Sequence, residues 1–295
     1  LADIHANPYA LDAVIADLAQ RDVDEIIVGG DIVGRGPQGS AVVDRIAELG
    51  WHGVRGNHED YLINFFREEV PDDWLTADIW SASRWMAAEL GAGRIALLDA
   101  LPFSTVSEAL PQVRVVHGSP ASNQEGLGTW TQPDVLRAHF DAVHEPVLVC
   151  AHTHRPLVER YDDGLIVNVG SVGLPFNGDT RAQYAIFSGD PGAPGVDVEL
   201  LQVEYDRGLL LDAYEHTGFL EHGGLTSAML QREVVHARPF LVPFLFWMQK
   251  LEREPTESEA QAFLDFYDPE VSMRQLIERF ESVVELAQRE GSSEE

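Results

Sequence analysis

Short apolar runs alternate with segments of helical spacing from the start of the chain to about residue 205. The runs rich in β-branched residues are predicted strands, at residues 25–29, 53–55, 113–116, 147–151, 165–169, 184–188 and 196–203. Residues 8–19 and 40–49 have apolar positions on one helical face, and Asn7 and Ser40 are their expected N-caps. This alternation predicts an α/β domain.

The pattern becomes helical in two places. Residues 59–101 are rich in Trp, Ala and Leu and predict a helical insertion, either a lid over a site or ordinary packing. After Tyr205 no strand pattern follows, and residues 257–267 and 272–289 predict charged amphipathic helices. We therefore predict a domain at 1–205 and an acidic helical extension at 206–295, which could mediate homo-oligomer formation. Residues 189–195 have the composition of a hairpin turn.

The amino-acid composition limits the kinds of molecule that the protein is expected to bind. The chain has 49 Asp and Glu against 20 Lys and Arg, a formal net charge of −29, which would repel an extended nucleic acid. Small phosphorylated substrates remain compatible, because bound divalent cations reverse the local field. No apolar run is long enough to span a membrane. The single cysteine, Cys150, lies in an apolar run, which favours a reducing, cytoplasmic location.

Polar clusters follow several predicted strands, where α/β sheets bind ligands. They are Asp3-Ile4-His5, Gly30-Asp31, Gly56-Asn57-His58-Glu59, His117-Gly118 and His152-Thr153-His154. Each alone is weak, because a single His or a Gly-Asp pair is more often structural. Together they supply carboxylates, an amide oxygen and imidazoles, a ligand set that suits Mn, Fe or Zn better than Mg or Ca. For two ions about 3.5–4 Å apart, one carboxylate must bridge them.

These clusters, in this order, resemble the calcineurin-like metallophosphoesterases, whose blocks read D-x-H, G-D, G-N-H-[ED], H and G-H-[ST]-H. The resemblance extends from Asp3 to about Tyr205. The blocks D-I-H-x-N and G-D-I-V-G and the late run Asn168-Val169-Gly170-Ser171-Val172-Gly173-Leu174-Pro175 look like the bacterial phosphodiesterase or bis-nucleoside-tetraphosphatase-related branch. The resemblance implies a four-layer α-β-β-α sandwich of two mixed sheets.

The resemblance also implies roles for the matched residues. The first metal would be bound by Asp3, His5 and His154, the second by Asn57, His117 and His152, with Asp31 bridging the two. The cofactor would be two divalent ions, with Mn favoured over Fe, Zn, Ni or Co. His58 would contact the phosphate and protonate the leaving alkoxide, while the two cations make hydroxide available from a bridging water.

One block departs from the protein-phosphatase form G-D-x-V-D-R-G. Gly34 stands where those enzymes have the aspartate that orients the histidine of G-N-H-E, so we expect His58 to use Asp60 or a backbone carbonyl, or to have no support. Arg35 is retained, either as a phosphate-binding catalytic residue or as a surface arginine in a turn. The D-x-H block begins at Asp3, so we expect residues of a first strand before Leu1.

The sequence thus predicts an enzyme that hydrolyses small phosphodiesters or phosphomonoesters. A protein-phosphatase-like enzyme is an alternative, supported by Arg35 and the block at 56–59 and opposed by Gly34. A non-catalytic metal-binding scaffold is a second alternative. The complete ligand set and the presence of His58 favour an enzyme over this scaffold. Fold alone does not choose the substrate.

Overall fold

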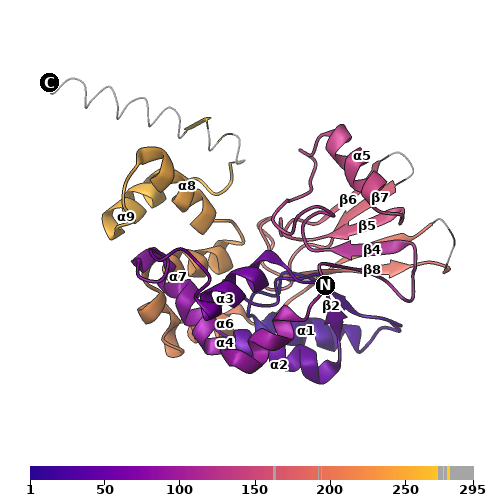
Figure 1. Cartoon of the computed structure of the whole chain (residues 1–295), viewed down its shortest axis with the longest axis horizontal. Helices are drawn as coiled ribbons and strands as arrows, with labels where there is room; N and C mark the ends of the chain where they lie inside the picture. Colours follow the sequence, from indigo (N-terminus) through magenta and orange to yellow (C-terminus); the bar gives the residue numbers. More distant parts are fainter. Residues whose placement is uncertain (162–163, 192, 194, 272–274, 276–277, 280–295) are drawn as a thin grey trace.

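The computed structural model describes residues 1–161, 164–191, 193, 195–271, 275 and 278–279. A five-stranded mixed sheet has the order β3-β4-β5-β7-β6. Its strands are β3 (Ser104–Val106), β4 (Val113–Val116), β5 (Val147–Cys150), β6 (Leu157–Tyr161) and β7 (Gly164–Asn168). Strands β4, β5 and β7 run parallel, while β3 and β6 pair antiparallel at the two edges. In Figure 1 this sheet lies on one side of the molecule and most of the helices lie on the other.

Two further ladders complete the strands. Strand β1 (Ile27–Val28) pairs parallel with β2 (His52–Gly53), and β8 (Ala182–Ser188) pairs antiparallel with β9 (Asp197–Val203), as a hairpin requires. The α/β class is confirmed, and the described strands form three hydrogen-bonded ladders; the four-layer arrangement of two mixed sheets stays a prediction. The pattern did not predict β3 and β6, because these edge strands are only partly buried and lack a continuous apolar run.

Helix α1 (Pro8–Leu18) begins as predicted, since the Asn7 side chain accepts a hydrogen bond from the Ala10 amide at 3.0 Å. Helix α2 (Gly39–Leu49) begins one residue earlier than expected, and the predicted Ser40 cap is wrong. The Ser40 amide lies within the helix and donates to the carboxylate of Glu89, at 3.1 and 3.2 Å from its two oxygens. A side chain from another helix therefore accepts a hydrogen bond from a backbone amide at the N-terminus of α2.

The predicted insertion is helical. It contains α3 (Asn57–Arg67), a 3₁₀ turn η1 (Asp78–Trp80) and α4 (Ser81–Asp99), which is interrupted at Gly91. Buried side chains of α4, including Met86 and Leu90, share one core with α1 and α2. Burial favours ordinary packing over a lid for α4, whereas α3 carries two of the predicted site residues at its first turn.

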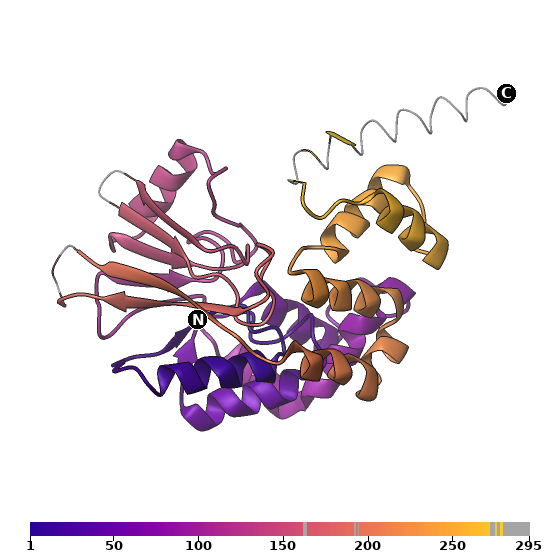
Figure 2. The ribbon, with the colours of Figure 1, turned by 180° about the vertical axis from the view of Figure 1, so that it is seen from behind.

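In the described part of the chain, the helices that follow the strands are α6 (Arg207–His216), α7 (Phe219–His236), α8 (Leu241–Leu251) and α9 (Glu257–Phe266). Tyr214 and Phe219 of α6 and α7 belong to the same core as α1, whereas α8 and α9 pack around their own cluster. Figure 2 shows α8 and α9 beyond α7, on the side away from the sheet. The division at residue 205 stays a prediction, and the predicted helix at 272–289 lies largely outside the described residues.

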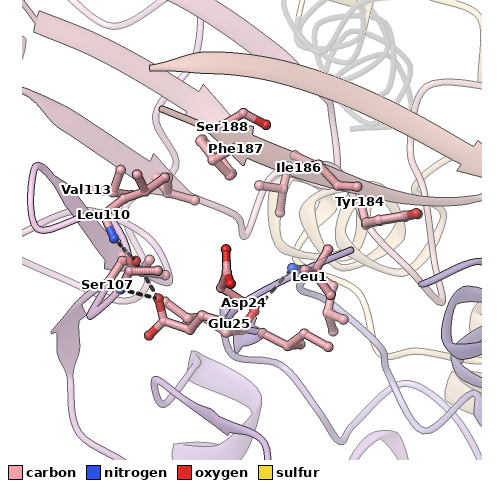
Figure 3. A pocket seen from close by; sticks show the side chains of 18 of the residues that line it. Leu1, Asp24, Glu25, Ser107, Leu110, Val113, Tyr184, Ile186, Phe187 and Ser188 are labelled. Carbon is pink, nitrogen blue, oxygen red and sulfur yellow. Dashed lines mark hydrogen bonds between the residues drawn. The ribbon is translucent and has the colours of Figure 1, made fainter. Parts of the chain in front are cut away.

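Both faces of the five-stranded sheet are covered by other elements. One face packs against β1, β2, β8 and β9, and the other packs against α5 (Pro133–Ala142). A cavity of about 370 Å³ lies beside β8, lined by Leu1, Glu25 and Ser107 among others (Figure 3). None of the seven predicted metal ligands lines this cavity. Among the described helices, none has the length and apolar character needed to cross a bilayer.

Candidate metal centre

The polar clusters converge in the folded chain. Two groups of side chains each bring their ligand atoms within 4.8 Å of one another, and each group could hold an ion. The first contains Asp3, His5, Asp31 and His154, and the second contains Asp31, His117 and His152. The Asn57 Oδ1 atom joins the second group, 3.0 Å from His117 Nε2 and 2.8 Å from His152 Nδ1. All seven predicted ligands therefore lie at one place, and Asp31 is common to both groups.

The histidines are oriented by the backbone. His5, His117 and His154 each place Nδ1 near a backbone carbonyl oxygen, at 3.2, 2.9 and 2.5 Å respectively. An Nδ1–H that donates to a carbonyl leaves the Nε2 lone pair free for a ligand bond. These Nε2 atoms face the carboxylates, with His5 3.6 Å and His117 3.4 Å from Asp31 Oδ2 and His154 3.5 Å from Asp3 Oδ1.

The two aspartates each have one oxygen held and one oxygen without a partner. Asp3 Oδ2 accepts from the His152 amide at 3.2 Å, and Asp31 Oδ1 accepts from the His58 amide at 2.9 Å. Their other oxygens, Asp3 Oδ1 and Asp31 Oδ2, are buried with no hydrogen-bond partner among the residues that the structure describes. Buried carboxylate oxygens are normally satisfied, so these two are the expected positions of cation bonds. The donor set fits divalent ions.

Burial changes the pKa values of the predicted metal ligands. Burial lowers the pKa of His5 to about 3 and that of His152 to about 4, so these imidazoles are neutral at pH 7, the form that binds metal. Burial raises the pKa of the Asp3 carboxyl well above its usual range; His117 partly offsets this, and the neighbouring Asp31 charge raises it further. Two crowded, buried carboxylates are an arrangement that cations stabilise.

The backbone at the site is left-handed at residues that rarely adopt this conformation. Positive φ angles between 49° and 64° occur at Asp3, His5, Asp31, Arg35, His152 and His154. Non-glycine residues in this region are uncommon and are concentrated at functional sites, where the surrounding structure holds them in place. The strain is therefore a second, independent indication that these loops form a functional centre.

Glu59 fixes two of these loops. It is fully buried, and its carboxylate accepts from the Asp31, Ile32 and Val33 amides at 2.8–3.2 Å and from the Gly56 amide at 2.7 Å. One side chain thus ties the loop after β1 to the start of α3. Glu59 belongs to the Gly56-Asn57-His58-Glu59 block, but the sequence predicted roles only for Asn57 and His58 of that block.

His58 has a partner that the sequence did not indicate. Arg35 Nε donates to His58 Nε2 at 3.1 Å, while Asp60 instead bonds Asn123 and Arg55. The expected support from Asp60 is therefore wrong. Glycine at position 34 makes room for the imidazole, because a Cβ there would lie 2.4 Å from His58 Nδ1.

Arg35 is held from the C-terminal helices. Its Nη1 atom donates to Glu233 Oε2 on α7 at 2.7 Å, and the arginine side chain is 13% exposed. The interpretation as a surface arginine is therefore wrong. Glu233 carried no sequence signal, since nothing in its neighbourhood matches a motif.

A pocket of about 240 Å³ opens over the cluster. Its residues come from the metal loops, from the segment after β7 and from the start of α8, and they are Asp31, Arg35, Asn57, His58, His152, His154, Arg155, Phe176, Pro239, Val242 and Pro243. The C-terminal extension therefore forms one wall of the site. Burial holds the pKa of His58 well below its usual value, with a smaller contribution in the same direction from Arg35.

Known proteins resemble this chain in sequence or in fold. A metallophosphoesterase of Sphaerobacter thermophilus has a similar structure, with TM-score 0.62 and 29% identity over 77% of this chain and 97% of that one. A hypothetical protein of Pyrococcus horikoshii shares the fold, with TM-score 0.61 and 23% identity over 76% of this chain and 97% of that one. An uncharacterized protein of Methanocaldococcus jannaschii is 26% identical over 73% of this chain and 89% of its own length.

The family assignment rests on a match to most of the α/β part of the chain. The family model described as the calcineurin-like phosphoesterase superfamily domain matches residues 1–191. The converging Asp and His residues supply a cluster that could hold metal ions. The chain belongs to the calcineurin-like phosphoesterase superfamily and is a metal-dependent phosphoesterase.

Proposed function

We propose that this enzyme hydrolyses small phosphodiesters or phosphomonoesters at a dinuclear centre. The observation that carries the proposal is Asp31 Oδ2, a buried oxygen without a hydrogen-bond partner that lies between two sets of histidines. A shared carboxylate is what two closely spaced cations require. The proposed place within the family is the bacterial phosphodiesterase or bis-nucleoside-tetraphosphatase-related branch.

The ligands divide into two sets. Asp3, His5 and His154 bind one ion and Asn57, His117 and His152 bind the other, with Asp31 on both. Mn is the proposed native metal, with Fe, Zn, Ni or Co as alternatives that the same donor set accepts. When bound, two such ions supply Lewis acidity toward the phosphate oxygens and lower the pKa of coordinated water.

Arg35 and His58 act together on the substrate. In the structure, Arg35 Nε donates to His58 Nε2, so that nitrogen carries a lone pair and no proton. A bound phosphate offers the guanidinium a stronger, charged acceptor. Once Arg35 turns to the phosphate, the anionic phosphate opposes the lowering of the His58 pKa, so His58 Nε2 can take up a proton from solvent and give it to the leaving alkoxide. This is the general-acid role that the resemblance implies.

The pocket favours small substrates. Its volume of about 240 Å³ is below the range of about 300–1,000 Å³ that is usual for drug-sized ligands. The protein-phosphatase-like alternative is disfavoured, because the imidazole of His58 occupies the space that an aspartate at position 34 would need. Self-association through the C-terminal helices and a cytoplasmic location stay predictions.

The proposal is tested with bis(p-nitrophenyl) phosphate and p-nitrophenyl phosphate, assayed with the metal-free protein and after addition of Mn, Fe, Zn, Ni or Co. We expect Mn-dependent release of p-nitrophenol and about two ions per chain by metal analysis. A panel of cyclic nucleotides, dinucleoside polyphosphates and phosphomonoesters then ranks substrates. Absence of turnover with every metal, despite stoichiometric binding, would favour the non-catalytic scaffold.

A further inference from the structure

We propose that Arg155 forms a second anion-binding subsite, so that the preferred substrates are compact organic molecules with a second phosphate group beside the one that is hydrolysed. The proposal rests on the proposed function, because it places the hydrolysed phosphate at the metal cluster. Arg155 follows the predicted ligand His154 directly and lines the same pocket. Neither the motifs nor the family match gave this arginine a role.

The guanidinium of Arg155 is anchored at one atom only. Its Nε donates to the Phe176 carbonyl oxygen at 3.2 Å, which fixes the plane of the group. Within the described part of the chain, its two Nη atoms have no acceptor and no carboxylate lies within ion-pair distance. A guanidinium with a fixed plane and two open nitrogens matches the geometry of a phosphate, which accepts two parallel hydrogen bonds.

Among the described residues Arg155 has no acidic partner, although the chain is rich in carboxylates. Acidic residues number 49 against 20 Lys and Arg, and the neighbouring Arg238 is paired with Glu270 at 2.8 Å. Arg155 is half-buried and lies near the positive charge of Arg238. An anion bound between the pocket and Arg155 would relieve this unfavourable arrangement.

The rest of the pocket defines what lies between the two anions. Phe176 and the residues Pro239, Val242 and Pro243 give it an apolar wall, and Val242 is half exposed. An apolar wall suits a carbon skeleton, while the volume of about 240 Å³ excludes a large one. The ligand class is therefore a short carbon chain or a single ring with a phosphate at each end.

Non-hydrolysable probes test the subsite by binding. Isothermal titration of the Mn-loaded protein compares methylphosphonate, which has one anionic group, with methylenediphosphonate and propane-1,3-diphosphonate, which have two. The variants are Arg155→Gln, Arg155→Lys and the control Arg160→Gln, which removes an equal charge from an exposed position on β6. Thermal unfolding of each variant checks that it is folded.

We expect at least one diphosphonate to bind the wild type about tenfold or more tightly than methylphosphonate, a gain of the size that one bidentate charged contact gives. Arg155→Gln should remove this gain, Arg155→Lys should keep part of it, and Arg160→Gln should keep all of it. A gain that survives in Arg155→Gln, or no gain in the wild type, overturns the subsite alone. Failure of every phosphonate to bind overturns the proposed phosphoester site as well.

Discussion

Arg35 Nη1 lies 2.7 Å from Glu233 Oε2, although the two residues are 198 positions apart in the sequence. The other Glu233 oxygen accepts from the Phe240 and Leu241 amides at 2.8 and 2.9 Å. One fully buried carboxylate therefore connects the arginine at the metal cluster to the segment that begins α8 and forms the pocket wall. We therefore expect Glu233 to act as a positioning residue, through its contact with Arg35.

Removing this carboxylate should destabilise the protein and displace Arg35. We expect Glu233→Ala to lower the free energy of unfolding by about 3 kcal/mol or more, because it leaves a buried guanidinium and two amides unpaired. The phosphoesterase activity should fall mainly through a higher KM, since Arg35 is proposed to bind phosphate. Urea unfolding and steady-state kinetics measure the two effects.

A double-mutant cycle separates this contact from general damage. Arg35→Met, Glu233→Ala and their combination should show a coupling energy of about 0.5–3 kcal/mol. Glu221→Ala, an exposed carboxylate on the same helix, should leave stability within about 0.5 kcal/mol of the wild type. Additive effects of Arg35→Met and Glu233→Ala would contradict the pairing.

Substitution of His58 should lower turnover, whereas substitution of Asp31 should lower the metal content. His58→Ala is expected to lower kcat by about 10²–10⁴-fold, the usual contribution of a general acid, while most of the metal is retained. Asp31→Ala should lose metal, because Asp31 belongs to both ligand groups. Metal analysis by mass spectrometry, together with kinetics, distinguishes them. Equal metal loss in the two variants would assign His58 to the ligands.

Gly34 can be tested against a matched glycine. Gly34 and Gly50 have φ angles of 81° and 66°, so alanine is strained at either position. A Cβ at Gly50 meets nothing within 4 Å, whereas one at Gly34 lies 2.4 Å from His58 Nδ1. Gly50→Ala should cost about 1–2 kcal/mol of stability and leave kcat unchanged. Gly34→Ala should cost more and also lower kcat, and equal kcat values would contradict the contact.

Metal removal should lower thermal stability through the two unpartnered oxygens. Cations that bind only the folded state add about 2.7 kcal/mol at a concentration one hundred times Kd. We therefore expect the melting temperature to fall in the presence of EDTA and to recover when Mn is added in excess. Asp31→Asn should lose most of this response. A response that is equal in the wild type and in Asp31→Asn would show that the stabilising ions bind elsewhere.

Cys150 should be inert in the folded protein. Burial raises the pKa of its thiol to about 12, so the thiol stays protonated at all pH values well below 12 and is unreactive as well as inaccessible. We expect no reaction with dithiobis(nitrobenzoic acid) at pH 8 and one equivalent after unfolding in guanidinium. Fast labelling of the native protein would indicate that the sheet opens around β5.

The apolar runs predicted the central strands of the sheet well. Strand β4 has the predicted bounds, and β5 differs from its prediction by one residue, because every residue of these two strands except Arg114 is apolar and buried. Edge strands such as β6 were missed, since alternate residues face solvent and interrupt the run. At the start of helix α2, the Ser40 amide donates to Glu89, and Ser40 is not the cap that was predicted. This contact joins distant segments, so no local sequence signal predicts it.

The sequence by itself determined the α/β class, the family and the order of the polar blocks, because ligand types and strand ends are local properties of the chain. Only the tertiary structure decided how His58 is supported and what Arg35 contacts. Those outcomes depend on Gly34 leaving space for a ring and on Glu233 arriving from α7. Contacts between segments so far apart follow from packing, which the spacing of residues along the chain does not specify.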